Sequence, residues 1–331
     1  MNDTAGLLAA LGLALAFAFL NGFHDSASIV ATAIASRAIP PRRALLWTAV
    51  GEFAGPFVLG VAVARVVGAG LVHPGAMSLG GLVAALSGAV VWGLLTWWWG
   101  LPSSSSHALV GGLVGAALAE GGPAAIQWRG LGAVLVALFL SPPLGFAAGF
   151  GLARGVFFLA QGASPRINRW FRHGQWWTTL GLALGHGAND GQKSMGLMAL
   201  ALLLAGRQST FQVTRPIIWA AAAAIALGAS VGGWRLIRTV GGRILRVRPV
   251  HGFVSQLGSG AVIVGAAWMG APISTTQVIN SALMGSGAAE RWSKVRWRVA
   301  RDMALAWLLT IPASGLLAAL GYGAWRVLGS P

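Results

Sequence analysis

The chain of 331 residues is 56% hydrophobic and only 9% charged, whereas soluble domains are about 45 to 50% apolar and about 25% charged. This composition excludes a soluble globular domain and predicts an all-α membrane protein. Apolar stretches close to the length that spans a bilayer, about 17 to 25 residues, recur along the whole chain and leave no room for a soluble domain of useful size. These stretches lie at residues 5–20, 44–68, 79–99, 103–119, 130–157, 178–205, 216–234, 254–270, 273–289 and 303–325.

The formal net charge of +16 comes largely from arginines that gather in short loops between the apolar stretches. Such loops follow the positive-inside rule of membrane proteins, and they do not interleave with exposed aromatics as a nucleic-acid surface would. The chain has no cysteine, which excludes disulfides and thiolate metal sites. The first stretch lacks the basic start and the cleavage site of a signal peptide, so we expect it to be the first membrane segment.

The sequence repeats itself after about half its length, which indicates an internal duplication. The offset between matched blocks is 165 to 173 residues. We therefore expect a first membrane half at 1–160, a basic cytoplasmic linker at 161–177 and a second membrane half at 178–331. The matched blocks are NGFHD at 21–25 with HGAND at 186–190; Gly55, Gly60, Arg65 and Gly68 with Gly228, Gly233, Arg238 and Gly241; and SGAV at 87–90 plus GLPSSSSH at 100–107 with SGAV at 259–262 plus GAPISTTQ at 270–277.

Basic residues predict the orientation of each half. The first loop, with Arg37, Arg42 and Arg43, is expected in the cytoplasm, whereas the loop at 69–78 has no Lys or Arg and is expected outside. Five crossings per half then give the second half the opposite orientation. An odd number of crossings per half makes an inverted repeat, the architecture of many secondary transporters. If the stretches at 103–119 and 273–289 re-enter instead of spanning, the number of crossings changes. In this topology the basic segments 166–172, 235–248 and 291–301 lie inside, and Arg207 and Arg215 lie outside.

Three of the seven acidic residues, Asp25, Glu52 and Asp190, lie within or close to apolar stretches. A carboxylate there costs at least about 2.5 to 3.5 kcal/mol on insertion scales, so we expect a functional role. Asp25 and Asp190 occupy equivalent repeat positions, each after a polar segment that contains glycine. We expect these segments to break their helices and to expose backbone groups to an ion. The alternative is a polar clamp between two helices.

Pro102 and Pro272 each precede a run of hydroxyl residues and an apolar stretch, a pattern that predicts the start of a helix. Helix N-termini with free amides and hydroxyl groups bind oxyanions. One such start would be ordinary, but two at equivalent positions of membrane segments favour a binding site. Lys193 is expected to neutralise Asp190 or contact the anion, or else to snorkel to an interface. His24 and His107 are expected to carry protons near neutral pH or to clamp helices.

Four motifs, found in order and in a duplicated layout, resemble those of the inorganic phosphate transporter (PiT) family. They are NGFHD at 21–25, PSSSSH at 102–107, GANDGQK at 187–193 and PISTTQ at 272–277. The resemblance covers nearly the whole chain. It implies cation-coupled phosphate import through an inverted-repeat fold in which the paired Asp motifs and the Ser/Thr hairpin tips form the central site.

The FHD and ANDGQK forms are more similar to the bacterial proton-coupled, metal-phosphate branch of the family than to the sodium-coupled branch. Two positions depart from the family pattern and bear on the coupling ion: Ser28 stands where members often have Asn, and Gln277 where they often have His. The resemblance implies a phosphate site at Ser26, Ser104, Ser105, Ser106, Asn189, Gln192, Lys193, Ser274, Thr275 and Thr276. It implies a coupling-ion site at Asn21, His24, Asp25, Glu52, His107, Asp190 and Gln277, with Asp25 and Asp190 able to bind a metal cation.

The sequence therefore predicts a phosphate symporter with several membrane crossings in the plasma (inner) membrane, and not an enzyme. Moving a divalent anion inward against the membrane potential costs about 2.3 kcal/mol per charge per 100 mV, so a co-bound cation favours uptake over leakage. We expect no cofactor beyond that cation, which is H+ or Na+, or a divalent metal carried with phosphate. We expect lipid but no nucleic acid as a partner, and a homodimer is compatible with the sequence. The alternatives are a sulfate or other oxyanion permease of the same fold and, in another class, an anion channel or a non-transporting sensor.

Overall fold

The computed structural model describes residues 3–329, without the side chains of residues 3, 74, 328 and 329, and within this range the chain forms helices and no strand. The two halves contain the same series of elements, α1–α6 and α7–α12. The helices are α1 (Asp3–Ala35), α2 (Pro41–Leu59), α3 (Ala62–Ala69), α4 (Leu79–Trp99), α5 (Ser105–Gly121), α6 (Trp128–Leu159), α7 (Ile167–Leu204), α8 (Arg215–Val231), α9 (Trp234–Arg243), α10 (Pro249–Trp268), α11 (Thr275–Glu290) and α12 (Trp297–Gly329), with short 3-10 turns η1 (Pro74–Ala76), η2 (Pro123–Ala125) and η3 (Trp292–Lys294).

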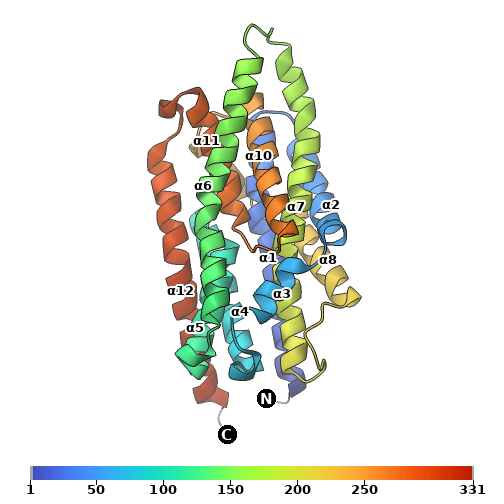
Figure 1. Cartoon of the computed structure of the whole chain (residues 1–331), viewed down its shortest axis with the longest axis vertical. Helices are drawn as coiled ribbons and strands as arrows, with labels where there is room; N and C mark the ends of the chain where they lie inside the picture. Colours follow the sequence, from blue (N-terminus) through green and yellow to red (C-terminus); the bar gives the residue numbers. More distant parts are fainter. Residues whose placement is uncertain (1–2, 330–331) are drawn as a thin grey trace.

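Four long helices, α1, α6, α7 and α12, run along the long axis of the molecule (Figure 1). At 1.5 Å per residue, the 32 residues of α6 extend about 48 Å, well beyond the hydrocarbon core of a bilayer, which is about 30 Å thick. The pairs α2–α3 and α8–α9 are bent by 86° and 65° at breaks of a few residues. Gly60 and Gly232 lie at these breaks with positive φ angles, which glycine adopts without strain.

The alternative in which 103–119 and 273–289 re-enter is confirmed, because the segments 79–121 and 249–290 are helical hairpins, and the count of ten crossings is therefore wrong. The α4–α5 hairpin has its base at the end of the molecule where both termini lie, and the α10–α11 hairpin has its base at the opposite end (Figure 1). Their tips meet, with Ser274 Oγ 2.8 Å from Ser104 Oγ. A hydropathy pattern shows how far an apolar segment extends in the sequence, but it does not show that the chain reverses direction halfway across.

Each half therefore crosses the molecule three times, as α1, α2–α3 and α6 in the first half and as α7, α8–α9 and α12 in the second. By length and composition, five described helices are long and apolar enough to cross a membrane, namely α1, α6, α12 and the hairpin legs α4 and α10, and the number rises to seven with each bent pair counted as one span. The long helix α7 is absent from that set because polar residues lie at its centre. Three is an odd number, as five was, so the inverted repeat is retained and the chain is a membrane protein with several crossings.

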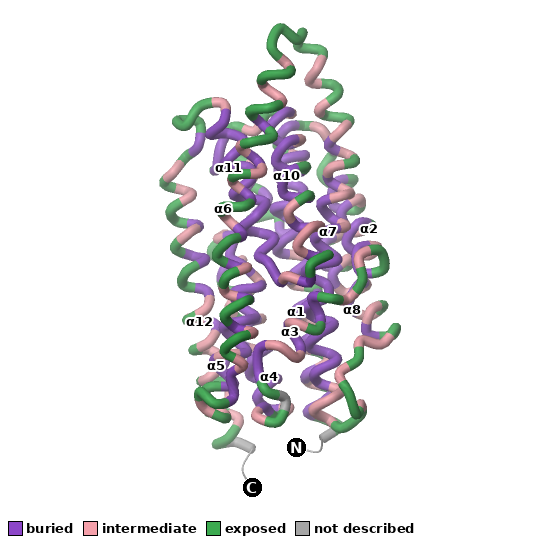
Figure 2. The backbone as a smooth tube through the Cα atoms, in the orientation of Figure 1, coloured by how far each residue is buried: buried purple, intermediate pink, exposed green. Residues whose placement is uncertain are grey.

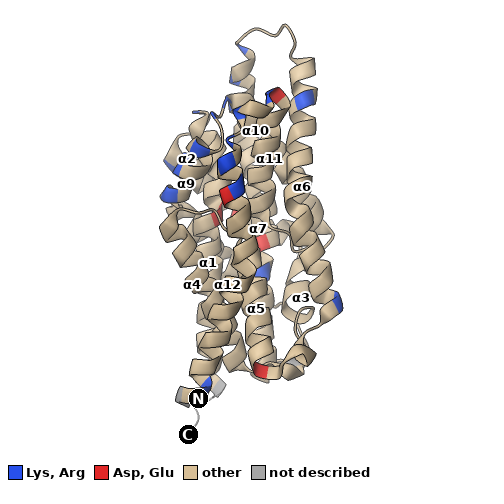
Figure 3. Ribbon diagram, turned by 90° about the vertical axis from the view of Figure 1, so that its left-hand side faces the viewer, with Lys and Arg blue, Asp and Glu red and all other residues tan. Residues whose placement is uncertain are grey.

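Lys and Arg residues concentrate toward one end of the molecule, around the α6–α7 turn and the loops before α10 and α12 (Figure 3). By the positive-inside rule we assign this end to the cytoplasm, and we call it the cytoplasmic end and the other the outer end. The segment 161–177, predicted as a basic linker, contains the α6–α7 turn and the first turns of α7.

The two halves pack across each other. The α4–α5 hairpin of the first half packs on α12 of the second, the α10–α11 hairpin of the second half packs on α6 of the first, and α2 packs along α7. Buried residues follow these contacts through the middle of the molecule (Figure 2). Glycines allow the helices to approach closely, since a Cβ on Gly149 of α6 would collide with the carbonyl oxygen of Ala282 on α11.

We expect Gly149→Ala to destabilise the protein by about 1 to 3 kcal/mol, because the added methyl group overpacks the contact between α6 and α11. The measurement is the melting temperature in detergent. Gly151→Ala on the same helix is the matched control, because a Cβ there has no neighbour within 4 Å among the described residues. Equal melting temperatures for the two variants would contradict the packing described here.

Candidate functional site

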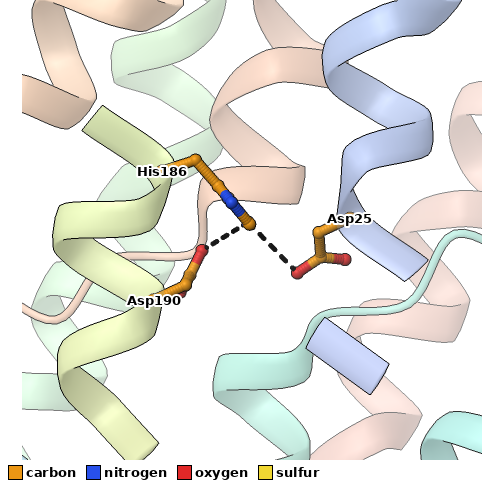
Figure 4. A group of neighbouring side chains, drawn as sticks. All are labelled: Asp25, His186 and Asp190. Carbon is orange, nitrogen blue, oxygen red and sulfur yellow. Dashed lines mark ion pairs between the residues drawn. The ribbon is translucent and has the colours of Figure 1, made fainter. Parts of the chain in front are cut away.

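Two aspartates at equivalent repeat positions lie on either side of one histidine at the centre of the molecule (Figure 4). Nε2 of His186 is 2.9 Å from Oδ2 of Asp190 and 3.9 Å from Oδ2 of Asp25, and all three side chains are fully buried. His186 and Asp190 are one turn apart on α7, and Asp25 comes from α1. The site therefore joins the equivalent helices of the two repeats.

A third carboxylate, Glu52 of α2, is also fully buried, with Oε1 2.9 Å from Nδ1 of His186. His24 provides a further cation when protonated, with Nδ1 2.8 Å from Oδ1 of Asp25. Buried charges are destabilising unless they are paired. When ionised, the three carboxylates require cations, which the protein supplies as Lys193 and, when protonated, His186 and His24.

The two hairpin tips bring hydroxyl groups to the two aspartates in the same way. Ser105, the first residue of α5, donates a hydrogen bond of 2.8 Å to Oδ2 of Asp25. Thr275, the first residue of α11, donates to Oδ2 of Asp190. The preceding residues, Ser104 and Ser274, cap the two helices as the sequence predicts. Two helix N-termini therefore meet beside two carboxylates.

Lys193 is the cation of α7 that reaches the hairpin tips. Its ammonium group pairs with Asp190 and also donates to Oγ of Ser106 at 2.5 Å and to the carbonyl oxygen of Ile273 at 3.0 Å. The side chain is only 1% exposed, so the alternative of snorkelling to an interface is wrong. Lys193 thereby joins both hairpins to the carboxylate cluster.

The predicted helix breaks before Asp25 and Asp190 are wrong, since α1 and α7 continue through 21–25 and 186–190. A glycine inside a helix costs only about 1 kcal/mol relative to alanine, and packing offsets this readily. Gly22 and Gly187 serve close helix contacts, because a Cβ on either would collide with a carbonyl oxygen, of Ile225 and Glu52 respectively. The irregular backbone lies instead at the hairpin turns and at the bends after α2 and α8.

The remaining predicted residues lie near the cluster with varied partners. Oε1 of Gln192 accepts the Val63 amide at 2.7 Å and so caps α3, and Ser26 donates only to its own helix at 3.5 Å. Asn189 donates to the carbonyl oxygen of Ala271 at 3.0 Å, and Nδ1 of His107 lies 2.8 Å from Oγ of Ser104. Nε2 of Gln277 is 3.4 Å from Nε2 of His107. Asn21 and Thr276 are buried, and their side-chain polar atoms have no hydrogen-bond partner within the described part of the chain.

The sequence pattern predicted no role for His186, which appears there only as the repeat equivalent of Asn21. A signal was present, because residues four apart on a helix lie on the same face and His186 precedes Asp190 by four. A ligand atom from each of Asp25, His186 and Asp190 lies within 4.8 Å of the others. Carboxylate and imidazole groups bind divalent cations, so the cluster is chemically suited to bind one.

A multi-pass membrane transporter with inverted repeats is the class that this fold and site define. The sequence profile of the Phosphate transporter family matches the chain twice, over residues 21–163 and 158–318. The chain belongs to this family, as its motifs predicted, and it is not an enzyme. In a bacterium such a protein lies in the plasma membrane.

Several curated relatives resemble the chain over nearly its whole length. A "Probable low-affinity inorganic phosphate transporter" of Rhizobium meliloti is 41% identical over 318 residues, which is 96% of this chain and 95% of the relative. A relative of the same description from Bacillus subtilis is 40% identical over 313 residues, which is 93% of this chain and 94% of the relative. A solved structure described as "The sodium-dependent phosphate transporter" has the same fold, with a TM-score of 0.87, 23% identity and coverage of 98% of this chain and 100% of that one.

We expect His186→Gln to reduce transport at least about tenfold, because it removes the imidazole that can pair, when protonated, with three buried carboxylates. The measurement is initial uptake by reconstituted protein, normalised to the protein inserted in the vesicles. His173→Gln, at an exposed position of the same helix, is the control and should retain the uptake of the unaltered protein. Full activity in His186→Gln would exclude an essential role for this histidine.

Proposed function

We propose that the protein is a secondary active transporter that imports inorganic phosphate together with a cation, by alternating access around the central site. The observation that carries the proposal is the meeting of two helix N-termini, α5 and α11, beside Asp25 and Asp190. Amides and hydroxyl groups at helix N-termini suit a tetrahedral oxyanion, and buried carboxylates suit a cation. The family and the names of the relatives support phosphate as the anion.

We propose that the coupling cation is a proton in preference to sodium, and that phosphate can be carried as a complex with a divalent metal. His24 and His186 contact the two aspartates, and imidazole exchanges protons in the physiological pH range. The cluster of Asp25, His186 and Asp190 also offers a mixed donor set of the kind that divalent metals bind. Sulfate is the second candidate anion, since hydroxyl groups, amides and Lys193 recognise any tetrahedral oxyanion.

Uptake of labelled phosphate into proteoliposomes, under separate proton and sodium gradients, tests this function. We expect accumulation driven by an inward proton gradient and resistant to excess sulfate. Accumulation driven by a sodium gradient would identify sodium as the coupling cation, whereas sulfate accumulation without phosphate uptake would identify sulfate as the substrate. Equilibration without accumulation under every gradient would exclude coupled transport and leave a channel.

We expect Asp25→Asn and Asp190→Asn each to abolish uptake while leaving membrane insertion intact, because an amide keeps the shape of the side chain but not the charge that pairs with a cation. The measurement is phosphate uptake alongside the amount of folded protein. Asp302→Asn is the control, since this carboxylate is half exposed and contacts only Arg301, at 3.5 Å, among the ion pairs of the described residues. Near-normal uptake by either site variant would contradict the paired-carboxylate site.

A further inference from the structure

Equivalent positions of the two repeats lie on opposite sides of the central site, so they can be compared directly. From Asp25, α1 continues toward the cytoplasmic end, whereas from the equivalent Asp190, α7 continues toward the outer end (Figure 1). A difference between two such positions cannot be a requirement of the fold, because both occupy the same place in it.

Along α1 and α7, four buried positions on the cytoplasmic side are polar where their outer equivalents are apolar, whereas next to the aspartates the outer residue is the more polar one, in the pairs Ser28 and Lys193 and Ile29 and Ser194. All of these residues are buried. At the offset of 165 residues that matches Asp25 to Asp190, the cytoplasmic and outer partners at the four positions are Thr32 and Leu197, Ser36 and Ala201, Thr179 and Ala14, and Gln175 and Ala10.

The hairpins show the same difference. Gln256 of α10 corresponds to Ala84 of α4, and Asn280 of α11 corresponds to Val110 of α5, at the offsets of the flanking motifs. Asn280 lies one turn beyond Thr276 on α11, so it directly follows the hairpin tip toward the cytoplasmic end. Each of these outer residues belongs to the largest apolar cluster of the described chain.

The polar residues of the cytoplasmic half face one another between α1, α7, α10 and α11. Nδ2 of Asn280 donates to Oγ of Ser28 at 3.4 Å. Nε2 of Gln256 donates to the carbonyl oxygen of Ile29 at 3.2 Å and to Oγ1 of Thr179 at 3.0 Å. These contacts begin one turn beyond Asp25, so a continuous series of polar groups runs from the site toward the cytoplasm.

A set of helix clamps would be the plain alternative, but clamps satisfy their polar groups. Oγ1 of Thr32, Oγ1 of Thr48 and Oδ1 of Asn280 are buried and have no hydrogen-bond partner within the described residues. Thr48 lies one turn from Glu52 on α2, on the same face. A buried polar group without a partner costs about 1 to 3 kcal/mol. On the outer side of α1 and α7, the described groups of this kind belong to Asn21, Gln192 and Ser194, all close to an aspartate, whereas Thr32 lies two turns beyond Asp25. Unpartnered groups thus extend farther from the site on the cytoplasmic side, where water or a passing ion solvates them during the cycle.

The two sides of the site also differ in the continuity of apolar packing. On the cytoplasmic side the packing is divided into four clusters, around Ile29, Val30, Leu283 and Val254, and the polar side chains of Gln256 and Asn280 lie between α1, α7, α10 and α11. On the outer side, one large cluster extends from Phe17 to Leu7 along α1 and from Leu197 to Ala201 along α7. The cytoplasmic barrier is therefore divided and contains polar groups, whereas the outer barrier is a single apolar cluster.

We propose that the transported ions leave the site for the cytoplasm along a polar route between α1, α7, α10 and α11, lined by Ser28, Thr32, Thr179, Gln256 and Asn280. In the substrate-free protein, water enters this route from the cytoplasm up to the contact between Asn280 and Ser28, while the outer side stays closed. The proposal rests on the proposed function and adds the path and the resting state. The contact between Asn280 and Ser28 closes the route next to the site, and its opening releases the ions.

Single cysteines test the route, because the chain contains no cysteine of its own. Thr32→Cys and Asn280→Cys are compared with their outer equivalents, Leu197→Cys and Val110→Cys, in membrane vesicles without phosphate. A membrane-impermeant cationic thiol reagent is applied from the cytoplasmic side or from the outside. We expect Thr32→Cys and Asn280→Cys to react from the cytoplasmic side at least about tenfold faster than Leu197→Cys and Val110→Cys react from either side. A tenfold ratio corresponds to a difference of about 1.4 kcal/mol in the free energy of access.

Equal reactivity of the matched pairs, or faster reaction of Thr32→Cys from the outside, would overturn the route. Thr48→Cys provides a second cytoplasmic position if Thr32→Cys does not fold, and each variant is checked by its melting temperature. Labelling needs no transported substrate, so a failure of phosphate uptake would leave this result intact. Normal phosphate uptake combined with equal labelling would contradict the route but leave the proposed function intact.

Asn280→Val, which restores the residue found at the outer equivalent Val110, provides a functional readout. We expect the maximal uptake rate to fall about tenfold, because desolvated ions then meet an apolar barrier, while phosphate binding measured at equilibrium changes less than about threefold. Val110 itself is already apolar, so Val110→Ala is the control, and it should leave the uptake rate nearly unchanged. An unchanged rate in Asn280→Val would remove Asn280 from the route.

Discussion

The burial of three carboxylates around His186 is the constraint on which the rest of the structure depends. Asp25, Glu52 and Asp190 come from α1, α2 and α7, and each is fully buried near the same imidazole ring. An unpaired buried charge costs several kcal/mol, so these helices must approach closely enough to share their cations. The glycines at their contacts allow this approach, and the hydroxyl groups of Ser105 and Thr275 hold the hairpin tips to the same cluster.

The backbone of the site is symmetric, but its charges are not. At the offset that matches Asp25 to Asp190, Lys193 corresponds to Ser28 and His186 corresponds to Asn21. Asp190 is therefore paired with a permanent cation, whereas the nearest cation of Asp25 is His24, which is charged only when protonated. The two equivalent carboxylates thus have different partners. For the coupled transport proposed above, this difference favours Asp25 as the carboxylate that receives the cation, with Asp190 and Lys193 acting together on the anion side.

The sequence predicted the features that repeat and those whose burial has a high free-energy cost. The matched motifs indicated the duplication, the caps at Ser104 and Ser274 and the importance of Asp25 and Asp190, because each of these depends on local chemistry. It left open whether 103–119 and 273–289 span or re-enter, because α5 and α11, with 17 and 16 residues, are close to the shortest length that spans a bilayer. It placed helix breaks at Gly22 and Gly187, where the glycines instead allow close packing. His186 was missed because its role arises from Asp25 and Glu52, which are far from it in the sequence.

The position of α11 links the site to the proposed route. Thr275 at its start bonds to Asp190, Gln277 approaches His107, and Asn280 one turn further bonds to Ser28. A shift of the α10–α11 hairpin away from α1 would break the Asn280 contact and withdraw the Thr275 hydroxyl from the site in one movement. Water entering along the polar side would then weaken the ion pairs of Asp190, because charge pairs lose strength as the local dielectric constant rises. Opening of the route and loosening of the site would thus be a single event, which is what release after coupled binding requires.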